Sequence, residues 1–270
     1  MAKKGAVAIA IAADPYLRKR RNPSEAEQQL HLKEVSFKCP LCGKLLRHRQ
    51  QKKANKLYEI AHIFPNSPTE EQYVSLRGLP RLGDNSESFE NKIALCKDCH
   101  SRQDYHTTKE DYLELLERKN RYLSQMDLDE ATLTMGLEPQ IAEVVMKISS
   151  LRENEIATLN YKPVSLAKKF SGEEMLLKNR VGMNVAHYYP YIRDCFKNLE
   201  GIKGFRLDAL SLQIKSCFTK MEKLSNNKSD IFEQLTKWVM EKTCNQSKEA
   251  CEAVVSFFVQ NCEVFNEITE

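Results

Sequence analysis

Two Cys-x-x-Cys pairs constrain the folding of this chain more than any other feature of its sequence. The pairs are "CPLC", with Cys39 and Cys42, and "CKDC", with Cys96 and Cys99. In each pair one tight turn can direct both sulfurs at a single ion, and two such turns supply the four tetrahedral thiolates that Zn²⁺ prefers. A redox dithiol needs only one pair and leaves the other unexplained. We therefore predict a structural zinc site that closes residues 43–95 into one folded unit.

The remaining five cysteines do not form pairs of this kind. They fall in apolar segments with helical spacing, so we expect buried free thiols: Cys195, Cys217, Cys244, Cys251 and Cys262. Zinc-binding thiols have to stay reduced, which is the condition of the cytosol and not of secreted proteins. We therefore expect a cytoplasmic protein.

The N-terminal stretch "MAKKGAVAIAIAADP" resembles a short signal peptide in its two lysines and its run of small apolar residues. That run, however, contains neither Leu nor Phe, and "YLRKRR" follows at once. We interpret the stretch as a mature N-terminus that forms a strand or stays flexible. No segment reaches the roughly 18 to 20 apolar residues that a membrane span requires, so we expect no membrane partner.

Positive charge is concentrated in the first half of the chain. Residues 1–125 hold 23 Lys+Arg and 16 Asp+Glu, a net charge of +7, whereas residues 126–270 hold 18 and 21, a net charge of −3. Most of the excess lies in "RKRR" at Arg18–Arg21 and in "KLLRHRQQKKANK" at Lys44–Lys56. A basic run is usually a solvated face, but these two runs flank the motif described next, which favours contact with nucleic acid.

The segment "KLYEIAHIFP", residues 56–65, lies between the cysteine pairs. Residues 57, 59 and 61 alternate with residues 58, 60 and 62, as the two faces of a strand do. Pro65 cannot continue the ladder of backbone hydrogen bonds. His62 is therefore expected at the end of a strand, facing an irregular loop. A histidine on such a strand is more often a packed core residue than a catalyst, so the surrounding chain has to decide its role.

A second motif, "NKIALCKDCHSRQDYH", covers residues 91–106. Its Cys99-His100 step opens a helical stretch, in which positions 100 and 104 lie four apart and share a face. An imidazole and the carboxylate of Asp104 are thereby brought together near a helix N-terminus, where backbone N–H groups favour an anionic phosphate. His106 falls within two turns of the start of the same helix.

The pattern "CPLC … EIAHIFP … NKIALCKDCH" resembles the HNH endonuclease family, whose active site is a two-stranded hairpin and a helix around one divalent metal. His62, Asn91 and His100 occupy the three name-giving positions. The sequence is most similar to the branch written A-H-I, N-x-x-A-L and H-x-x-x-D, with the zinc knuckles of many members. The resemblance covers residues 35–106.

This resemblance implies a role for each motif residue. His62 would be the general base that takes a proton from the attacking water, a task that suits a neutral imidazole. His100 would bind the catalytic divalent cation, Mg²⁺ or another, which neutralises the phosphate and the departing oxygen. Asn91 would hold the loop after the hairpin through hydrogen bonds from its side chain to the backbone. The four cysteines would be scaffold, because a closed zinc site has no open position for substrate.

Ala61 is a departure from the family pattern. Many members have an Asp or His at this position, immediately before the general base, as a second metal ligand. The carboxylates within reach are Glu59, on the same strand face as Ala61, and Asp104, which we prefer slightly because it shares a helix face with His100. His106 could instead contact metal or phosphate. If none of these residues binds the metal, the domain is a nuclease relic that binds its substrate without cleaving it.

The second half of the chain shows apolar residues at helical spacing. We expect a linking helix at about 108–124, capped by Thr107 and Glu110, another cap at Ser171 and Glu174, and helices at about 139–152, 206–224, 230–243 and 248–261. The last contains "AVVSFFVQ", apolar on most sides, and should be buried in this chain or against a partner. We interpret "VAHYYPYIRDCF", residues 185–196, as a packed aromatic corner; contact with bases or a protein is the alternative.

These patterns predict an α+β chain in three parts. A basic N-terminal extension, residues 1–34, precedes a ββα-metal HNH domain with its linking helix, residues 35–125, and an all-helical assembly or regulatory domain follows at 126–270. No glycine-rich phosphate loop occurs, so ATP-driven control has to come from elsewhere. The layout is similar to effector subunits of bacterial anti-phage systems. The partners implied are DNA and a sensor or ATPase protein, a second copy of the chain, or both.

Two functions remain open at this level. The first is a metal-dependent DNA endonuclease of low sequence selectivity, because basic runs attract phosphates without reading bases. The second is a zinc-stabilised nucleic-acid-binding or protein-binding adaptor with weak or no catalysis. The first is favoured because a zinc module alone has no use for His62, Asn91 and His100 in this order. The sequence does not distinguish DNA from RNA as the substrate.

Overall fold

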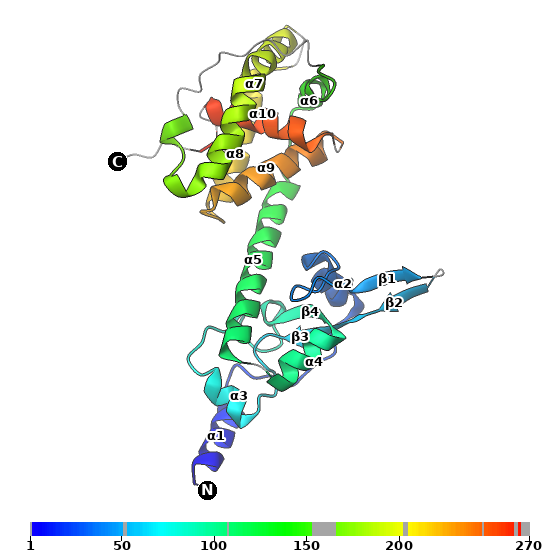
Figure 1. Cartoon of the computed structure of the whole chain (residues 1–270), viewed down its shortest axis with the longest axis vertical. Helices are drawn as coiled ribbons and strands as arrows, with labels where there is room; N and C mark the ends of the chain where they lie inside the picture. Colours follow the sequence, from blue (N-terminus) through cyan, green and yellow to red (C-terminus); the bar gives the residue numbers. More distant parts are fainter. Residues whose placement is uncertain are drawn as a thin grey trace. The chain divides into compact units, whose positions relative to one another are not determined.

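The computed structural model describes residues 2–50, 53–106, 108–152, 166–201, 205–244, 246–261 and 264–265. Cys262 therefore lies outside the described residues, as does most of the C-terminal tail. The chain divides into two compact units, Met1–Met126 and Asp127–Glu270 (Figure 1). The first holds both cysteine pairs and the histidine motif, and the second is helical. No helix in the described part of the chain combines the length and the apolar character needed to cross a bilayer.

The centre of the first unit is a two-stranded sheet followed by a helix. Strand β3 (Tyr58–His62) pairs antiparallel with β4 (Lys92–Cys96), with His62 opposite Lys92. Helix α4 (Lys97–His106) begins directly after β4. All five residues of β4 are buried, so this strand lies inside the unit and α4 packs against both strands. The predicted ββα arrangement is confirmed.

Short helices complete the first unit. They are α2 (Glu25–Glu34), which begins with a capping box between Ser24 and Glu27, α3 (Glu70–Ser75), and the 3₁₀ turn η1 (Phe89–Asn91). Of these, α2 and η1 contact β4. Helix α5 (Lys109–Leu133) begins in the first unit, and the division between the units falls within it. Its start is capped by Thr108 and Asp111; Thr107, which was predicted to cap it with Glu110, lies outside the described residues.

A buried ion pair fixes α5 to the rest of the first unit. Lys119 of α5 donates to Glu34 of α2, and both side chains are 0% exposed. Lys119 also lies over the ring of Phe89, on which His31 stacks with centroids 4.3 Å apart. Burial lowers the pKa of both Lys119 and His31. Removing one member of such a pair leaves an uncompensated buried charge, at a cost of about 3 to 5 kcal/mol.

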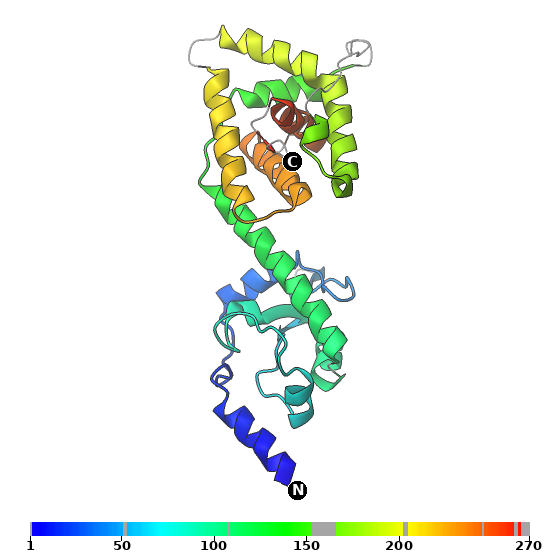
Figure 2. The same ribbon diagram turned by 90° about the vertical axis from the view of Figure 1, so that its left-hand side faces the viewer.

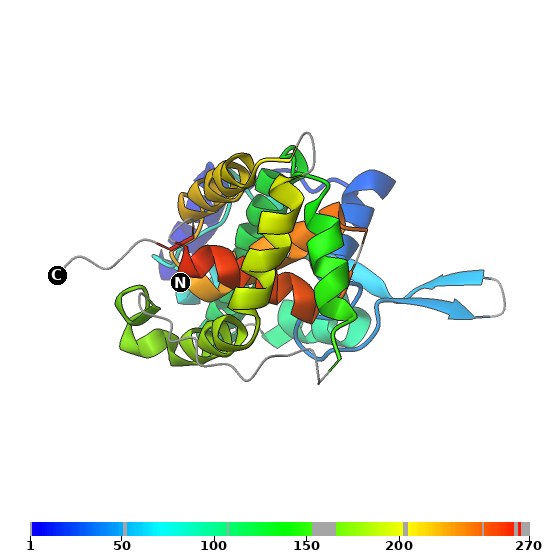
Figure 3. The ribbon, with the colours of Figure 1, turned by 90° about the horizontal axis from the view of Figure 1, so that it is seen from above.

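A separate β-hairpin extends from the first unit. Strands β1 (Arg47–Gln50) and β2 (Lys53–Lys56) form a two-stranded sheet of their own within the described chain and reach beyond the rest of the unit (Figure 3). The sequence reasoning noted the basic run here but did not predict strands. Arg47 and Lys56 face each other across the hairpin, and like charges in that position destabilise a ladder. Their side chains donate to Gln29 and Gln28 of α2, which anchors the base of the hairpin.

The expectation of a strand-forming or flexible N-terminus is wrong. Residues Ala2–Ala13 form the α-helix α1, which contacts α3 (Figure 2). Val7, Ile9 and Ile11 alternate as in a strand, but alanines fill most of the other positions, and alanine has the highest helix propensity of all residues. Ile9 is 72% exposed, so the alternating apolar residues do not mark a buried strand.

The second unit is a bundle around a buried helix. Its members are α6 (Ile141–Ser149), α7 (Met175–Glu200), α8 (Leu207–Glu222), α9 (Lys228–Lys242) and α10 (Lys248–Gln260), with short 3₁₀ turns η3 (Leu166–Lys168) and η4 (Gly172–Glu174) before α7. Helix α10 carries the "AVVSFFVQ" segment and packs against α6, α7 and α9, with every residue from Ala253 to Gln260 buried. Among the described residues after Met126 every regular element is helical, as predicted, and the Ser171–Glu174 cap is confirmed.

The aromatic stretch at residues 185–196 lies within α7, with Pro190 inside the helix. Tyr189 stacks on Phe257 of α10 with ring centroids 4.9 Å apart, and its hydroxyl donates to Asn261. The neighbouring tyrosines pack against the same core, so the packed-corner interpretation is confirmed.

Candidate active site

The four predicted zinc ligands gather at one point. The sulfur atoms of Cys39, Cys42, Cys96 and Cys99 all lie within 4.8 Å of one another, and the Cys42 and Cys96 sulfurs are 3.6 Å apart. In a tetrahedral Zn–S₄ site with Zn–S distances of about 2.3 Å, adjacent sulfurs are about 3.8 Å apart. The donor set and its spacing fit Zn²⁺. No other group of three or more His, Cys, Asp or Glu ligands occurs in the described part of the chain.

Two different turns present these thiols. In the first, Gly43 has φ +73°, and its N–H donates to the carbonyl of Cys39 at 2.8 Å. In the second, Cys96 ends β4 and Cys99 lies in the first turn of α4. A backbone hydrogen bond at Lys44 lowers the pKa of Cys42 to about 7, whereas burial raises the pKa of Cys96 and Cys99. A metal here would join the loop at residues 39–44 to the strand–helix junction.

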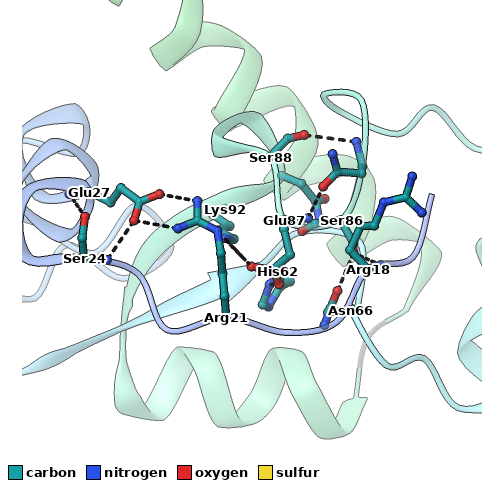
Figure 4. A network of polar contacts seen from close by, with 12 residues as sticks. Arg18, Arg21, Ser24, Glu27, His62, Asn66, Ser86, Glu87, Ser88 and Lys92 are labelled. Atoms are coloured by element: carbon teal, nitrogen blue, oxygen red, sulfur yellow. Dashed lines mark hydrogen bonds and ion pairs between the residues drawn. The ribbon is translucent and has the colours of Figure 1, made fainter. Parts of the chain in front are cut away.

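His62 lies at the end of β3 in a buried group of charged side chains (Figure 4). Its Nε2 is 2.8 Å from Oε1 of Glu87, and Oε2 of Glu87 accepts a hydrogen bond of 2.7 Å from Lys92. The exposed fractions of the three side chains are 10%, 8% and 3%. From helix α4, Gln103 donates to the backbone carbonyl of His62. The end of the strand is therefore held from both sides.

Burial keeps the ring of His62 neutral. Burial lowers the pKa of His62, and the positive charges of Lys92 and Arg20 act in the same direction, against the opposing effect of Glu87. For Glu87, burial alone would raise the pKa, but the hydrogen bonds with Lys92 and His62 bring it below its ordinary value. At neutral pH Glu87 is therefore a carboxylate and the imidazole of His62 is neutral.

Asn91 ties the two chain segments beside His62 together. Its side chain accepts from the N–H of Phe64 at 2.8 Å and donates to the carbonyls of Phe64 at 3.0 Å and Ser86 at 2.9 Å. The backbone carbonyl of Asn91 accepts from Ile63, and the residue is 0% exposed. These are hydrogen bonds of the kind that the sequence reasoning assigned to this position.

His100, Glu59 and Asp104 form a second cluster. Nδ1 of His100 is 2.7 Å from Glu59 of β3, and Nε2 is 3.3 Å from Asp104, one turn further along α4. Both carboxylates are about half exposed. Because the two nitrogens point to different sides of the ring, Glu59 and Asp104 cannot both join His100 on one ion in this arrangement. Ala61 is fully buried, and the side chain of His106 lies outside the described residues.

The two clusters lie at different positions along β3. Glu59 precedes His62 by three residues, which is about 10 Å in a strand. The structure thus brings His62 together with Glu87 and Lys92, and His100 together with Glu59 and Asp104, but does not gather Glu59, His100 and Asp104 as one set of metal ligands.

The basic run Arg18–Arg21 passes beside the His62 cluster (Figure 4). The backbone holds it there, since the N–H of Arg18 donates to the hydroxyl of Ser86 and the N–H of Ser86 donates to the carbonyl of Tyr16. Arg21 pairs with Glu27, and its Nε is 4.0 Å from Glu87. All four basic residues of the run are exposed, so positive charge borders the end of β3.

Glu87 was missed by the sequence reasoning. It lies in the polar loop "DNSESFEN", residues 84–91, which has no periodic pattern. The side chain of Asn85 accepts from the N–H of Glu87, and the side chain of Ser88 accepts from the N–H of Asn85. The sequence offers one signal for Glu87. It is a carboxylate four residues before Asn91, in a loop that has to bring the chain back to pair with the first strand of the hairpin.

Two family models match the chain. HNH endonuclease (HNH_2) matches residues 39–107, and C-terminal domain 11 of the ABC-three component (ABC-3C) systems matches residues 128–265. The second match covers 138 of the 270 residues. No curated protein and no solved structure matches the chain significantly.

Proposed function

Because this chain belongs to the family of C-terminal domain 11 of the ABC-three component systems and carries an HNH endonuclease domain before it, we propose that it is the nuclease component of such a system. Its activity would be hydrolysis of DNA phosphodiester bonds with the help of a divalent cation. The observation that carries this proposal is the neutral, oriented imidazole of His62 at the end of β3, on a ββα unit whose helix bears His100 and Asp104.

In the proposed reaction His62 takes a proton from a water molecule. The water oxygen forms a bond to phosphorus, the bond from phosphorus to the 3′ oxygen breaks, and solvent returns a proton to the 3′ oxygen. The products are a 5′-phosphate and a 3′-hydroxyl. Asn91 keeps the loop after β3 in place through its three side-chain hydrogen bonds to the backbone.

We assign the catalytic cation to His100 and Asp104. The pair fits such an ion because Asp104 is exposed, which leaves room for water and for phosphate oxygens, and Mg²⁺ is commonly bound through one or two carboxylates plus substrate phosphates. Glu59 accepts from Nδ1 of His100 and would orient the ring with Nε2 toward the ion. When bound, the cation neutralises the phosphate and the departing oxygen.

The substrate in this proposal is DNA, read with little sequence selectivity. The exposed run Arg18–Arg21 beside His62 supplies phosphate contacts that do not depend on the bases. A cytoplasmic location belongs to the same proposal, since the zinc thiols must stay reduced. The partners would be the other components of the system, with a sensor or ATPase among them, and the second unit would dock them or a second copy of the chain. The system would act in antiviral defence.

One observation favours the alternative function, a zinc-stabilised adaptor with weak or no catalysis. Ala61 offers no ligand, and the described residues bring only Asp104 to Nε2 of His100. A site with two protein ligands binds a divalent cation weakly unless substrate completes it.

The test is conversion of supercoiled plasmid by the full chain, with and without its partner components, in Mg²⁺, Mn²⁺ or Ni²⁺. We expect nicked or linear product from the parent and none from His100→Ala. The matched control His187→Ala, at an exposed histidine of α7, should keep the parental activity. A parallel reaction with RNA separates the two kinds of substrate.

Two results would argue against the nuclease. If fully zinc-loaded parent and partners leave plasmid and RNA intact in all three cations, the adaptor function replaces it. If His100→Ala cuts as fast as His187→Ala, the metal assignment is wrong.

A further inference from the structure

Glu87 is a buried charged residue that contacts a motif residue and that the motif positions do not explain. We infer that it is a positioning residue for His62: it holds the imidazole in the Nε2–H tautomer and leaves Nδ1 as the atom that takes the proton. This inference rests on the proposed nuclease function. It adds a residue outside the three name-giving positions and specifies which ring nitrogen acts.

The two hydrogen-bond partners of Glu87 keep its carboxyl group ionised. Oε2 accepts from Lys92 at 2.7 Å and Oε1 faces Nε2 of His62 at 2.8 Å. With its pKa lowered by these partners, Glu87 is a carboxylate at neutral pH. An ionised carboxylate only accepts hydrogen bonds. The ring nitrogen that faces it must therefore carry a proton.

The imidazole of His62 carries a single proton. Because burial lowers the pKa of His62, the imidazole is neutral at pH 7 and carries a single N–H. That proton is on Nε2, so Nδ1 holds the lone pair. Within the described part of the chain no residue makes a hydrogen bond to Nδ1, and the side chain keeps 10% of its surface exposed. Nδ1 thus has its lone pair available for a proton from water.

The charges around the ring of His62 have opposing effects on its pKa. An isolated carboxylate at 2.8 Å would raise the pKa of His62 and favour an imidazolium, which cannot act as a base. Burial of the ring is the largest effect against this, and Lys92, which is paired with the same carboxylate and stands opposite His62 in the sheet register, acts in the same direction. Arg20 contributes in the same direction, and Arg21 lies 4.0 Å from Glu87. Gln103, from α4, is uncharged and donates to the backbone carbonyl of His62.

Glu87 then has a role both before and after proton transfer. Before it, the carboxylate fixes the rotation and tautomer of the ring, as the third member of a nucleophile–base–carboxylate triad does. After Nδ1 takes the proton, the imidazolium keeps its Nε2–H bond to an anion. Lys92 keeps that anion ionised throughout.

The direct test is the tautomer of His62 in the full chain. Histidine labelled with ¹⁵N gives distinct nitrogen shifts for the two tautomers, and His62→Ala assigns the signal. We expect Nε2–H at pH 7.5 in zinc-loaded protein without other divalent cations. A predominant Nδ1–H signal would overturn the inference, whether or not the protein cuts DNA.

The second test is the rate of Glu87→Gln. A glutamine can donate to Nε2 as well as accept from it, so it permits the wrong tautomer and removes the negative charge. We expect kcat to fall on the order of 10²-fold or more while KM stays within about twofold. The acid limb of the pH–rate profile should move to lower pH, because the pKa of His62 falls without the carboxylate. Glu71→Gln, at an exposed position of α3, is the matched control and should leave kcat unchanged.

A second variant separates positioning from stability. Glu87→Gln leaves the buried ammonium of Lys92 unpaired, which can unfold the unit by itself. Glu87→Gln with Lys92→Met removes both charges. If the double variant retains zinc and the parental melting temperature, its kcat should still show the loss seen with Glu87→Gln.

The outcomes distinguish this inference from the proposed function. If His62→Ala is inactive but folded Glu87→Gln has the parental kcat and pH profile, the inference fails and the nuclease assignment stands. If His62→Ala cuts like the parent, the nuclease mechanism fails, and the tautomer measurement still decides what Glu87 does to the ring.

Discussion

Asn91→Ala tests whether the loop beside His62 is held by one amide side chain. The amide is fully buried and makes three hydrogen bonds, to the N–H and the carbonyl of Phe64 and to the carbonyl of Ser86. Each buried backbone group left without its partner costs about 1 to 3 kcal/mol. Allowing for relaxation of the loop, we expect the first unit to lose about 3 to 5 kcal/mol of unfolding free energy. That is a large share of the roughly 5 to 15 kcal/mol of a typical domain.

The chain offers a separate reporter for each unit. Its single tryptophan, Trp238, is buried in the second unit, so fluorescence in urea follows that unit. Zinc released to a chromogenic chelator follows the first, where all four ligands lie. We expect Asn91→Ala to lower the urea midpoint for zinc release and to leave the Trp238 transition in place.

The matched control for this experiment is Asn120→Ala, at an exposed position of α5, which should change the stability by no more than about 0.5 kcal/mol. A midpoint for Asn91→Ala equal to that of the control would refute the reasoning. It would mean that the three hydrogen bonds contribute nothing net, or that water replaces the amide without cost.

Three further predictions concern the metal, the base and the basic run. Cys39→Ser with Cys42→Ser should abolish zinc binding and unfold the first unit, since such sites contribute ~10 kcal/mol or more; metal content and circular dichroism check this, and a double variant with the parental melting temperature would contradict it. Because burial lowers the pKa of His62, cleavage should be lost only as pH falls below the ordinary histidine value of about 6.5; an acid limb above that value in the pH–rate profile counts against the assignment. Arg18→Gln with Arg20→Gln should reduce the slope of log K against log salt for duplex DNA by up to about 2, because each phosphate that a basic side chain neutralises adds about 0.9 to that slope. The control is a variant in which two lysines of α8 are neutralised. If the slope for Arg18→Gln with Arg20→Gln is unchanged and equals that of the control, the run Arg18–Arg21 does not contact DNA.

Much of the first unit could be predicted because short-range patterns there have local physical causes. Alternation at residues 57–62 and the end of the ladder before Pro65 predicted β3, which spans Tyr58–His62. The spacing of the thiols predicted the cluster of four sulfurs. In both cases a local sequence pattern determines the structure. For the strand it is the alternation of side chains with a period of two residues, and for the thiols it is a turn of fixed length between two cysteines.

The rest depended on contacts between segments far apart in the chain. Glu87 meets His62 across 25 positions, and no local pattern marks either residue as a partner of the other. The pairing of Nδ1 of His100 with Glu59 across 41 positions has the same character. Sequence spacing favoured Glu59 and Asp104 as alternative ligands, and it could not show that they lie on opposite sides of one ring.

The helical character of the second half could be predicted from the sequence, but not every helix could be predicted as a single element. Apolar spacing located α6, α8, α9 and α10 to within a few residues. The long helix α7 was not predicted as one element, because Pro190 and a run of tyrosines break the usual helical signals. There, packing against α10 outweighs local propensity.

The central claim is that the imidazole of His62 activates the nucleophile. Its most direct test is the single-turnover rate of plasmid cleavage by His62→Ala in saturating Mn²⁺, with the partner components present and zinc content equal to that of the parent. The account predicts a rate at least about 10²-fold below the parental rate, the usual contribution of a general base. A variant that cuts at the parental rate contradicts it.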